Sequence, residues 1–157
     1  MSGPREIRLA ELPGLVGTRL GESPWHTITQ ADIDRFADAT GDHAAIHVDP
    51  EASRAGPFGT TIAHGFLTLS LVAPLCARAF RLTDAAFLVN YGTNRVRFPA
   101  PVPSGARVRL EATLTAAEPR AQGTLLTLDF TMHLENSPRA AVVGETLLLV
   151  VAEGHDG

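Results

Sequence analysis

Hydrophobic and polar residues alternate in two segments near the end of the chain, at residues 107–114 and 126–134. Side chains of a β-strand point alternately to its two faces, so this alternation predicts strands with one buried and one solvated face. The residues expected on the buried faces are Val108, Leu110, Ala112, Leu114, Leu126, Leu128, Phe130, Met132 and Leu134. Such alternation is typical of antiparallel sheets that cover a core on one side.

Two further strands accompany these in the sequence. Residues 85–98 form one of them, in which Gly92 predicts a β-bulge. The turn-forming segment APVPSG, residues 100–105, then separates this strand from the next. Residues 141–152 alternate less regularly, which predicts an interior and more buried strand.

The spacing of apolar residues predicts a helix at residues 28–40. This segment begins with a capping signal and is followed by a glycine. Thr29 and Asp32 have the spacing of a capping box, and Gly41 is of the type that commonly ends a helix. The apolar stripe of this helix consists of Ile33, Phe36 and Ala37. Residues 64–80 predict a second helix that is apolar around nearly its whole circumference and therefore buried, with a kink at Pro74.

Helices followed by a run of strands predict an α+β protein. One apolar helix accompanied by four long antiparallel strands predicts a curved sheet wrapped around that helix, which is the hot-dog fold. A chain of 157 residues fits a single domain. We expect this domain to span residues 1–157, with 1–14 and 153–157 as peripheral tails.

A long irregular connection, residues 42–63, joins the two helices, and a connection of this length in a compact domain is usually functional. Asp42 and His47 lie in it between Gly41 and Pro50, which oppose a continuous helix, so a turn can bring the carboxylate and the imidazole together. Such a pair converging on one water is an acid–base unit. In the alternative interpretation Asp42 merely follows the helix end and His47 packs on the sheet.

The start of the apolar helix is a second candidate. Gly65 and Phe66 are its first residues, where unpaired N–H groups and the helix dipole favour negative charge. A thioester carbonyl that becomes enolate-like is a charge that such a site could stabilise. In the structural alternative, His64 caps the helix and Gly65 permits close packing against the sheet.

Composition and charge exclude several classes of function. The net charge of −4 gives no basic surface for nucleic acid, and all 13 cationic residues are Arg, which excludes Schiff-base lysine chemistry. Cys76 is the single cysteine, so no intrachain disulfide can form, and its apolar surroundings predict a small core residue. The longest apolar stretch, residues 66–80, is too short to cross a membrane. Because the N-terminus lacks the apolar core of a signal peptide, we expect a cytoplasmic protein.

Three segments together resemble the MaoC-like (R)-specific enoyl-CoA hydratases, in particular their single-hot-dog, nodulation-protein-N-like branch. They are TGDHAAIHVDPE at 40–51, GPFGTTIAHGFLTLSL at 56–71 and NYGTNRVRFPAPVPSGARVRL at 90–110. The resemblance spans roughly residues 25–150, nearly the whole chain.

The resemblance implies that Asp42 and His47 hold a water and add it across a trans-2-enoyl-CoA to give the (R)-3-hydroxyacyl-CoA, with the roles of acid and base left open. It also implies that Gly65, beside His64, contributes its N–H to a thioester oxyanion hole. Members of the family are homodimers with acyl-CoA tunnels near the interface, and they use no cofactor or metal. The candidates for binding the CoA phosphates are Arg95 and Arg97.

The chain departs from the family pattern at Ala44 and Ala45, where many relatives carry Asn-Pro. This departure favours the alternative of a non-catalytic subunit that binds acyl thioesters. A hot-dog thioesterase is a further alternative, but such enzymes usually place a carboxylate on the buried helix, and residues 64–80 contain no Asp or Glu. The last alternative is a metal site built from Asp42, His43, His47 and Asp49.

Overall fold

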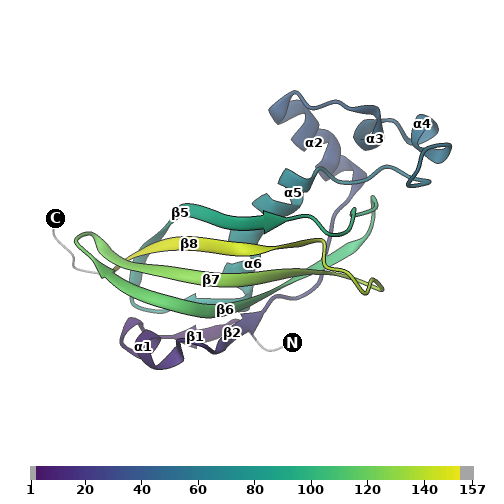
Figure 1. Ribbon diagram of the computed structural model, residues 1–157. Helices are drawn as coiled ribbons and strands as arrows, with labels where there is room; N and C mark the ends of the chain where they lie inside the picture. Colours follow the sequence, from purple (N-terminus) through teal and green to yellow (C-terminus); the bar gives the residue numbers. More distant parts are fainter. Residues whose placement is uncertain (1–2, 153–157) are drawn as a thin grey trace.

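The computed structural model describes residues 3–152, and its main element is an antiparallel sheet (Figure 1). Its long strands are β5 (Ala85–Arg97), β6 (Arg107–Arg120), β7 (Gly123–Leu134) and β8 (Val142–Ala152). The strands pair in the order β2-β6-β7-β8-β5, and the short strand β3 (His26–Thr27) pairs with β6. β8 is therefore an interior strand, as predicted, and the register of β5 shifts between Asn90 and Gly92, which confirms the bulge.

The sheet buries one face, as the alternation predicts. Val108, Leu110, Ala112 and Leu114 on β6 are completely buried. On β7, at most 2% of the surface of each buried-face residue is exposed: Leu126, Leu128, Phe130 and Met132. Helix α6 (Val72–Ala79) lies against this face and contributes Leu75, Cys76 and Ala79 to the core (Figure 1). This arrangement of a sheet around a central helix is the hot-dog fold that the sequence predicts.

The central helix is broken into α5 (Gly65–Ser70) and α6, with Leu71 between them. Pro74 explains the position of the break, because a proline ring clashes with the carbonyl group four residues earlier, here that of Ser70. The prediction of burial around the whole circumference is wrong. One side of the helix is exposed, and its exposed residues are Phe66, Ser70, Pro74, Ala77 and Arg78. No other part of residues 3–152 covers these side chains.

The N-terminal segment is part of the core rather than the peripheral tail expected for residues 1–14. It forms β1 (Arg5–Ile7), a 3-10 turn (Leu9–Glu11), α1 (Leu12–Leu15) and β2 (Arg19–Glu22). β1 pairs in parallel with β4 (Phe80–Leu82), and Ile7 and Leu12 are 1% exposed. Apolar residues at the edge of the core therefore fix this segment in place. The other expected tail, 153–157, lies outside the described residues.

Helix α2 (Gln30–Thr40) begins with the predicted capping box. The Thr29 hydroxyl accepts from the Asp32 N–H at 3.2 Å, and the Asp32 carboxylate accepts from the Thr29 N–H at 3.0 Å. The helix ends at Gly41, which adopts the left-handed conformation (φ 80°). Two short helices follow, α3 (Ala45–Val48) and α4 (Pro50–Arg54). Figure 1 shows α2, α3 and α4 grouped beyond one end of the sheet, next to α5.

Among the helices of residues 3–152, none is long and apolar enough to cross a membrane.

The capping box gives a prediction for stability. Asp32→Ala removes the partner of Thr29 and an anion from the first turn of α2, so we expect the free energy of unfolding at pH 7 to fall by about 1 kcal/mol. The hydrogen bonds from Thr29 lower the pKa of Asp32 below its ordinary value of 3.8. The carboxylate therefore stabilises the protein above that pKa and loses its effect as pH falls through it. Urea unfolding should give a difference between the two proteins at pH 7 that shrinks towards about pH 3. Equal free energies of unfolding for the wild type and Asp32→Ala at pH 7 would contradict the prediction.

Candidate active site

The loop between α2 and α5 is fastened to its surroundings by a small set of hydrogen bonds. The Ile62 N–H donates to the Ile46 carbonyl at 3.0 Å, and the Ala63 N–H donates to the Val102 carbonyl at 2.8 Å. The Gln30 side chain adds two contacts, because its amide N–H donates to the His47 carbonyl and its oxygen accepts from Thr61. Helix α3 and the segment before α5 are therefore held side by side.

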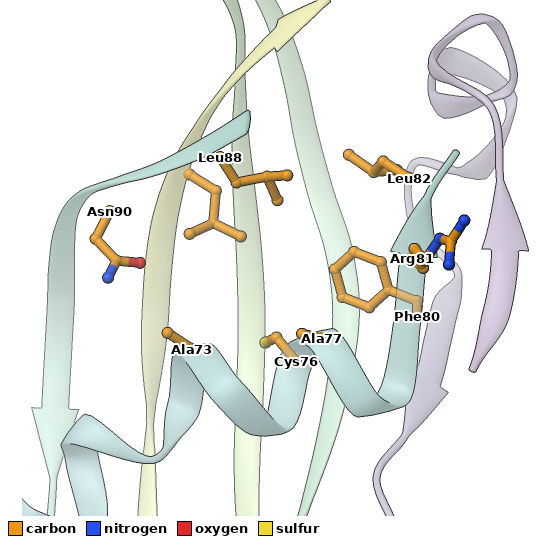
Figure 2. A pocket seen from close by; sticks show the side chains of 9 residues that line it. Ala73, Cys76, Ala77, Phe80, Arg81, Leu82, Leu88 and Asn90 are labelled. Carbon is orange, nitrogen blue, oxygen red and sulfur yellow. The ribbon is translucent and has the colours of Figure 1, made fainter. Parts of the chain in front are cut away.

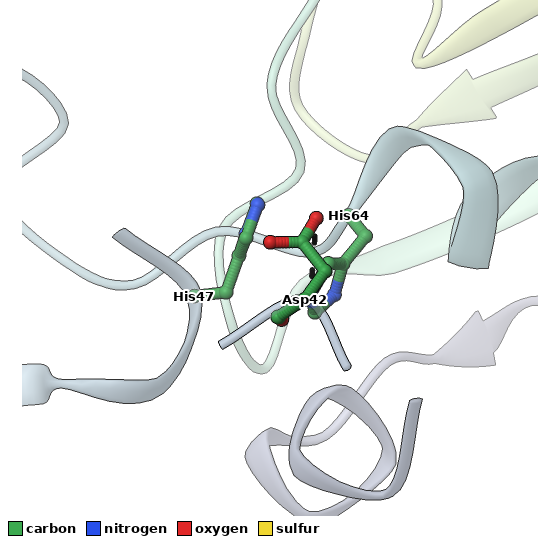
Figure 3. Close-up of side chains that lie close together, drawn as sticks. All are labelled: Asp42, His47 and His64. Carbon is green, nitrogen blue, oxygen red and sulfur yellow. Dashed lines mark hydrogen bonds and ion pairs between the residues drawn. The ribbon is translucent and has the colours of Figure 1, made fainter. Parts of the chain in front are cut away.

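Asp42, His47 and His64 come together in this loop region (Figure 3). One carboxylate oxygen of Asp42 and one ring nitrogen of each histidine lie within 4.8 Å of one another. The Asp42 side chain is 57% exposed, whereas His47 and His64 are 9% and 3% exposed. Gly41 turns the chain immediately before Asp42, and α3 presents His47. The site thus combines a carboxylate open to water with two buried imidazoles.

The hydrogen-bond partner of His47 determines which of its ring nitrogens is free. Its Nδ1 lies 2.7 Å from the Ile62 carbonyl oxygen, which can only accept, so Nδ1 carries the hydrogen. The neutral ring then has an unshared electron pair on Nε2. Near Asp42 this ring accordingly offers a second proton acceptor.

The separations in this cluster fit one bridging water. A water that donates two hydrogen bonds of about 2.8 Å at its tetrahedral angle spans about 4.5 Å between the acceptors. One oxygen of Asp42 and one nitrogen of His47 lie no more than 4.8 Å apart, a limit that is compatible with this span. The pair can therefore hold and polarise a single water.

The same cluster is poorly arranged for a metal ion. The rings of His47 and His64 are stacked, with centroids 3.8 Å apart and planes 25° apart. An imidazole binds zinc at about 2.0–2.1 Å along the in-plane direction of its lone pair, and stacking keeps the two lone pairs in separate, nearly parallel planes, which disfavours a common point. The alternative set from the sequence is not assembled either, because His43 bonds Asp38 and the Asp49 carboxylate caps α4.

Gly65 and His47 line the same hollow, a cavity of about 280 Å³. No acceptor for the Gly65 N–H occurs among the hydrogen bonds of residues 3–152, as expected for the first residue of a helix. A Cβ on Gly65 would lie 3.1 Å from the Phe98 ring, so glycine lets that ring pack directly over the helix start. The remaining lining is mostly apolar: Phe58, Ile62, Ala63, Thr68, Phe98, Ala100, Pro101, Val102 and Ala141.

A second cavity, of about 330 Å³, lies between α6 and β5 (Figure 2). Its walls are Ala73, Cys76, Ala77, Phe80, Arg81, Leu82, Leu88, Asn90 and Leu148, and they include no carboxylate or histidine. Burial raises the pKa of the Cys76 thiol to about 12, which keeps it protonated at neutral pH. Cys76 is thus a core residue, as predicted, and this cavity has no nucleophile or general base.

Comparison with known proteins identifies the family. A family model described as the MaoC like domain matches residues 12–131. The chain belongs to the MaoC-like dehydratase family. The 3-hydroxyacyl-thioester dehydratase Z of Mycobacterium tuberculosis is 48% identical over 145 residues, which cover 92% of this chain and 96% of that protein. The nodulation protein N of Rhizobium leguminosarum bv. viciae is 41% identical over 154 residues, covering 96% of each chain.

A solved MaoC-like relative in fold is the unliganded R-hydratase PhaJ1 of Pseudomonas aeruginosa. It superposes with a TM-score of 0.75 at 24% identity, over 97% of this chain and 90% of that one. At this level of identity the likeness concerns the fold, and it agrees with the hot-dog arrangement described above.

The departure of this MaoC-like chain at Ala44 and Ala45 affects the start of α3. Ala44 is the N-cap of α3 and has no side-chain oxygen for the free N–H groups of that turn. The turn is closed by the backbone instead, because the His47 N–H donates to the Ala44 carbonyl at 2.9 Å. The position of His47 is therefore kept without a side-chain cap.

The two arginines proposed for phosphate binding lie apart from the Gly65 cavity and differ in their partners. The Arg95 guanidinium pairs with the Glu145 carboxylate on β8. Arg97 is exposed and donates to the Val96 carbonyl. The structure thus brings Asp42, His47, His64 and Gly65 together and leaves both arginines outside the group.

Three contributors to this MaoC-like site were not found from the sequence. They are the Ile62 carbonyl, the Gln30 side chain and the Phe98 ring. A backbone carbonyl has no side-chain signature, and Gln30 is an ordinary residue for a first helical turn. Residues 85–98 were predicted as a strand and APVPSG as the turn after it, which gave no sign that Phe98 packs on Gly65.

Gln30 provides a test of how the loop is held. Gln30→Leu leaves the His47 carbonyl and the Thr61 hydroxyl without their partner, so we expect the free energy of unfolding to fall by about 1–3 kcal/mol. Hydrogen exchange of the His47 and Ile62 amides should also accelerate. Gln122→Leu, at an exposed turn position, is the matched control and should change neither quantity. Equal stabilities for both variants would show that Gln30 does not hold the loop.

Proposed function

We propose that this protein hydrates trans-2-enoyl-CoA to (R)-3-hydroxyacyl-CoA, and catalyses the reverse dehydration, with Asp42 and His47 acting on one water. The observation that carries the proposal is the placement of a carboxylate and an imidazole nitrogen within bridging distance of one water, with His47 and the Gly65 N–H on one cavity. The family and the names of its relatives, a 3-hydroxyacyl-thioester dehydratase and an R-hydratase, support the same chemistry.

The proton balance follows from the two acceptors. As the water oxygen bonds to Cβ of the enoyl group, the pair removes one proton from the water, and the C=C electrons move towards the thioester carbonyl. The pair then returns one proton to Cα, while the second water hydrogen stays on the new hydroxyl. His47 can take part in both steps because Ile62 holds its Nδ1–H and leaves Nε2 free.

The negative charge that develops on the thioester oxygen needs a donor. Gly65 supplies one, because its N–H is unpaired within the described chain and opens α5 next to the cavity. The absence of a side chain at this position lets the Phe98 ring pack over the helix start, on the wall of the same cavity. The proposed substrate thus has its Cβ towards the Asp42–His47 pair and its carbonyl oxygen towards Gly65.

The CoA phosphates need cationic or backbone donors on the surface. Of the two arginines considered, Arg97 is the better candidate, because within residues 3–152 its guanidinium has no carboxylate partner, whereas Arg95 pairs with Glu145.

Crotonyl-CoA tests the function directly. We expect the purified protein to remove the absorbance of the conjugated enoyl thioester and to form (R)-3-hydroxybutyryl-CoA. Asp42→Asn and His47→Gln should each lower kcat/KM by about 10²–10⁴-fold, because each removes one proton-transfer group. His43→Gln is the control, since His43 neighbours Asp42 but bonds Asp38 outside the cluster.

Three outcomes would contradict the proposal. Near-wild-type rates in both Asp42→Asn and His47→Gln would remove the acid–base pair. Release of free CoA thiol with crotonate as the acyl product, in place of 3-hydroxybutyryl-CoA, would identify a thioesterase instead. Tight binding of acyl-CoA of several chain lengths without turnover would identify a binding subunit.

The assembly that we propose is a homodimer formed through β5. β5 is an edge strand of the sheet, and a long apolar edge is a template for pairing with another chain. Its exposed residues include Phe87, Leu88, Val89 and Tyr91. A second copy that pairs along this edge extends the sheet and covers these side chains.

Val89→Lys tests this assembly. Val89 is 43% exposed on β5, and a lysine there places a charge in the proposed interface. We expect sedimentation velocity to give about twice the 16.6 kDa chain mass for the wild type and a shift to monomer in the variant. Val16→Lys, at a residue that is also 43% exposed but lies at the end of α1, should leave the dimer intact. A dimer that persists in Val89→Lys would place the interface elsewhere.

A further inference from the structure

We propose that His64 is a positioning residue that aligns both members of the Asp42–His47 pair without itself exchanging protons with the substrate. The inference rests on the proposed function for its kinetic effect, and on the geometry of the cluster for its structural effect. His64 lies immediately before α5 and is 3% exposed.

The first contact fixes the backbone of Asp42. His64 Nε2 lies 2.9 Å from the Asp42 carbonyl oxygen, which can only accept, so Nε2 carries the hydrogen. The same nitrogen is 4.0 Å from the Asp42 carboxylate. Asp42 follows the left-handed Gly41 and has few other bonds, namely contacts at 3.4 Å to Thr40 and Ala44. The His64 hydrogen bond is therefore the shortest tie on the residue that carries the carboxylate.

The second contact fixes the ring of His47. His64 stacks on His47 with a centroid separation of 3.8 Å, and the Phe36 ring lies 5.0 Å away from His64. The stacking with His64 thus fixes the orientation of the His47 ring plane, and the hydrogen bond to the Ile62 carbonyl fixes the rotation of the ring within that plane. One buried side chain contacts both reactive groups.

The remaining ring nitrogen of His64 separates this role from ordinary capping or packing. Nδ1 is buried and has no hydrogen-bond partner among residues 3–152, and the side chain makes no capping bond to α5. An unpartnered buried acceptor lowers stability, and an apolar residue of similar size would avoid that loss. The histidine is explained by its two contacts, the hydrogen bond from Nε2 to the Asp42 carbonyl and the stacking of its ring on His47.

Three substitutions distinguish the donor from the bulk of the side chain. His64→Gln keeps an N–H donor at a reach comparable to Nε2, His64→Asn has its donor too close to the backbone, and His64→Leu has none. We expect His64→Asn and His64→Leu to lower kcat for crotonyl-CoA hydration by about 10²-fold with little change in KM, because displaced reacting groups slow the chemical step. His64→Gln should recover most of the loss, and thermal unfolding should show that each variant is folded under the conditions of the kinetic measurement.

A measurement without substrate tests the same proposal independently. In long-range ¹H–¹⁵N spectra of histidine-labelled protein at neutral pH, we expect His64 with its hydrogen on Nε2 and His47 with its hydrogen on Nδ1. In His64→Leu the His47 signals should shift and the amide signals of residues 42–44 should broaden. In His64→Gln the amide signals of residues 42–44 should stay sharp, because the donor to the Asp42 carbonyl is restored, while the His47 signals should still shift because the stacked ring is lost. His43→Gln, in the same loop, is the control for both measurements.

The outcomes separate this inference from the proposed function. If the wild type does not hydrate crotonyl-CoA, the proposed function fails, and the spectra alone decide whether His64 positions the pair. An active wild type whose three His64 variants all keep its kcat overturns the positioning role. A hydrogen on His64 Nδ1, or unchanged His47 and loop signals in His64→Leu, also overturns it.

Discussion

The hydrogen bond from the His47 ring to the Ile62 carbonyl is the contact on which the site depends. It joins α3 to the segment that runs into α5, and the Ile62 N–H returns a bond to the Ile46 carbonyl. Without it the imidazole could turn about its side chain and either nitrogen could carry the hydrogen. With it, one nitrogen is committed to the protein and the other is free for a water. These two hydrogen bonds therefore fix the position of His47 although it lies in a long irregular connection.

Much of the fold could be predicted from the sequence because each long strand has one face in the core and the other in water. Strict alternation in β6 and β7 reports a core on one side and water on the other, and the structure has that burial. The central helix was harder, because an apolar circumference does not reveal which face lies on the sheet. Phe66 is 69% exposed although it is as apolar as the buried Leu67. Within the described part of one chain, that side of the helix stays uncovered.

The candidate site could be predicted only in part. Asp42 and His47 are close in sequence and flanked by residues that break helices, so a local turn suffices to bring them together. His64 was recognised as the residue before the helix, but its bond to the Asp42 carbonyl depends on how a connection of about twenty residues folds back. Arg95 and Arg97 lie on β5, outside the Asp42–His47–His64 cluster, and side chains on a strand follow its register. The register decides which carboxylate they meet, and for Arg95 this is Glu145.

The first turn of α2 both begins the helix and contacts the candidate site. Gln30 lies between the two members of the capping box, and its amide reaches across to His47 and Thr61. Unwinding this turn would therefore release the far side of the loop, even though the capping residues do not touch the acid–base pair. The hydrogen bonds from Thr29 that lower the pKa of Asp32 favour the charged carboxylate in this turn. A helix start at the protein surface thereby helps to hold the backbone of a buried histidine.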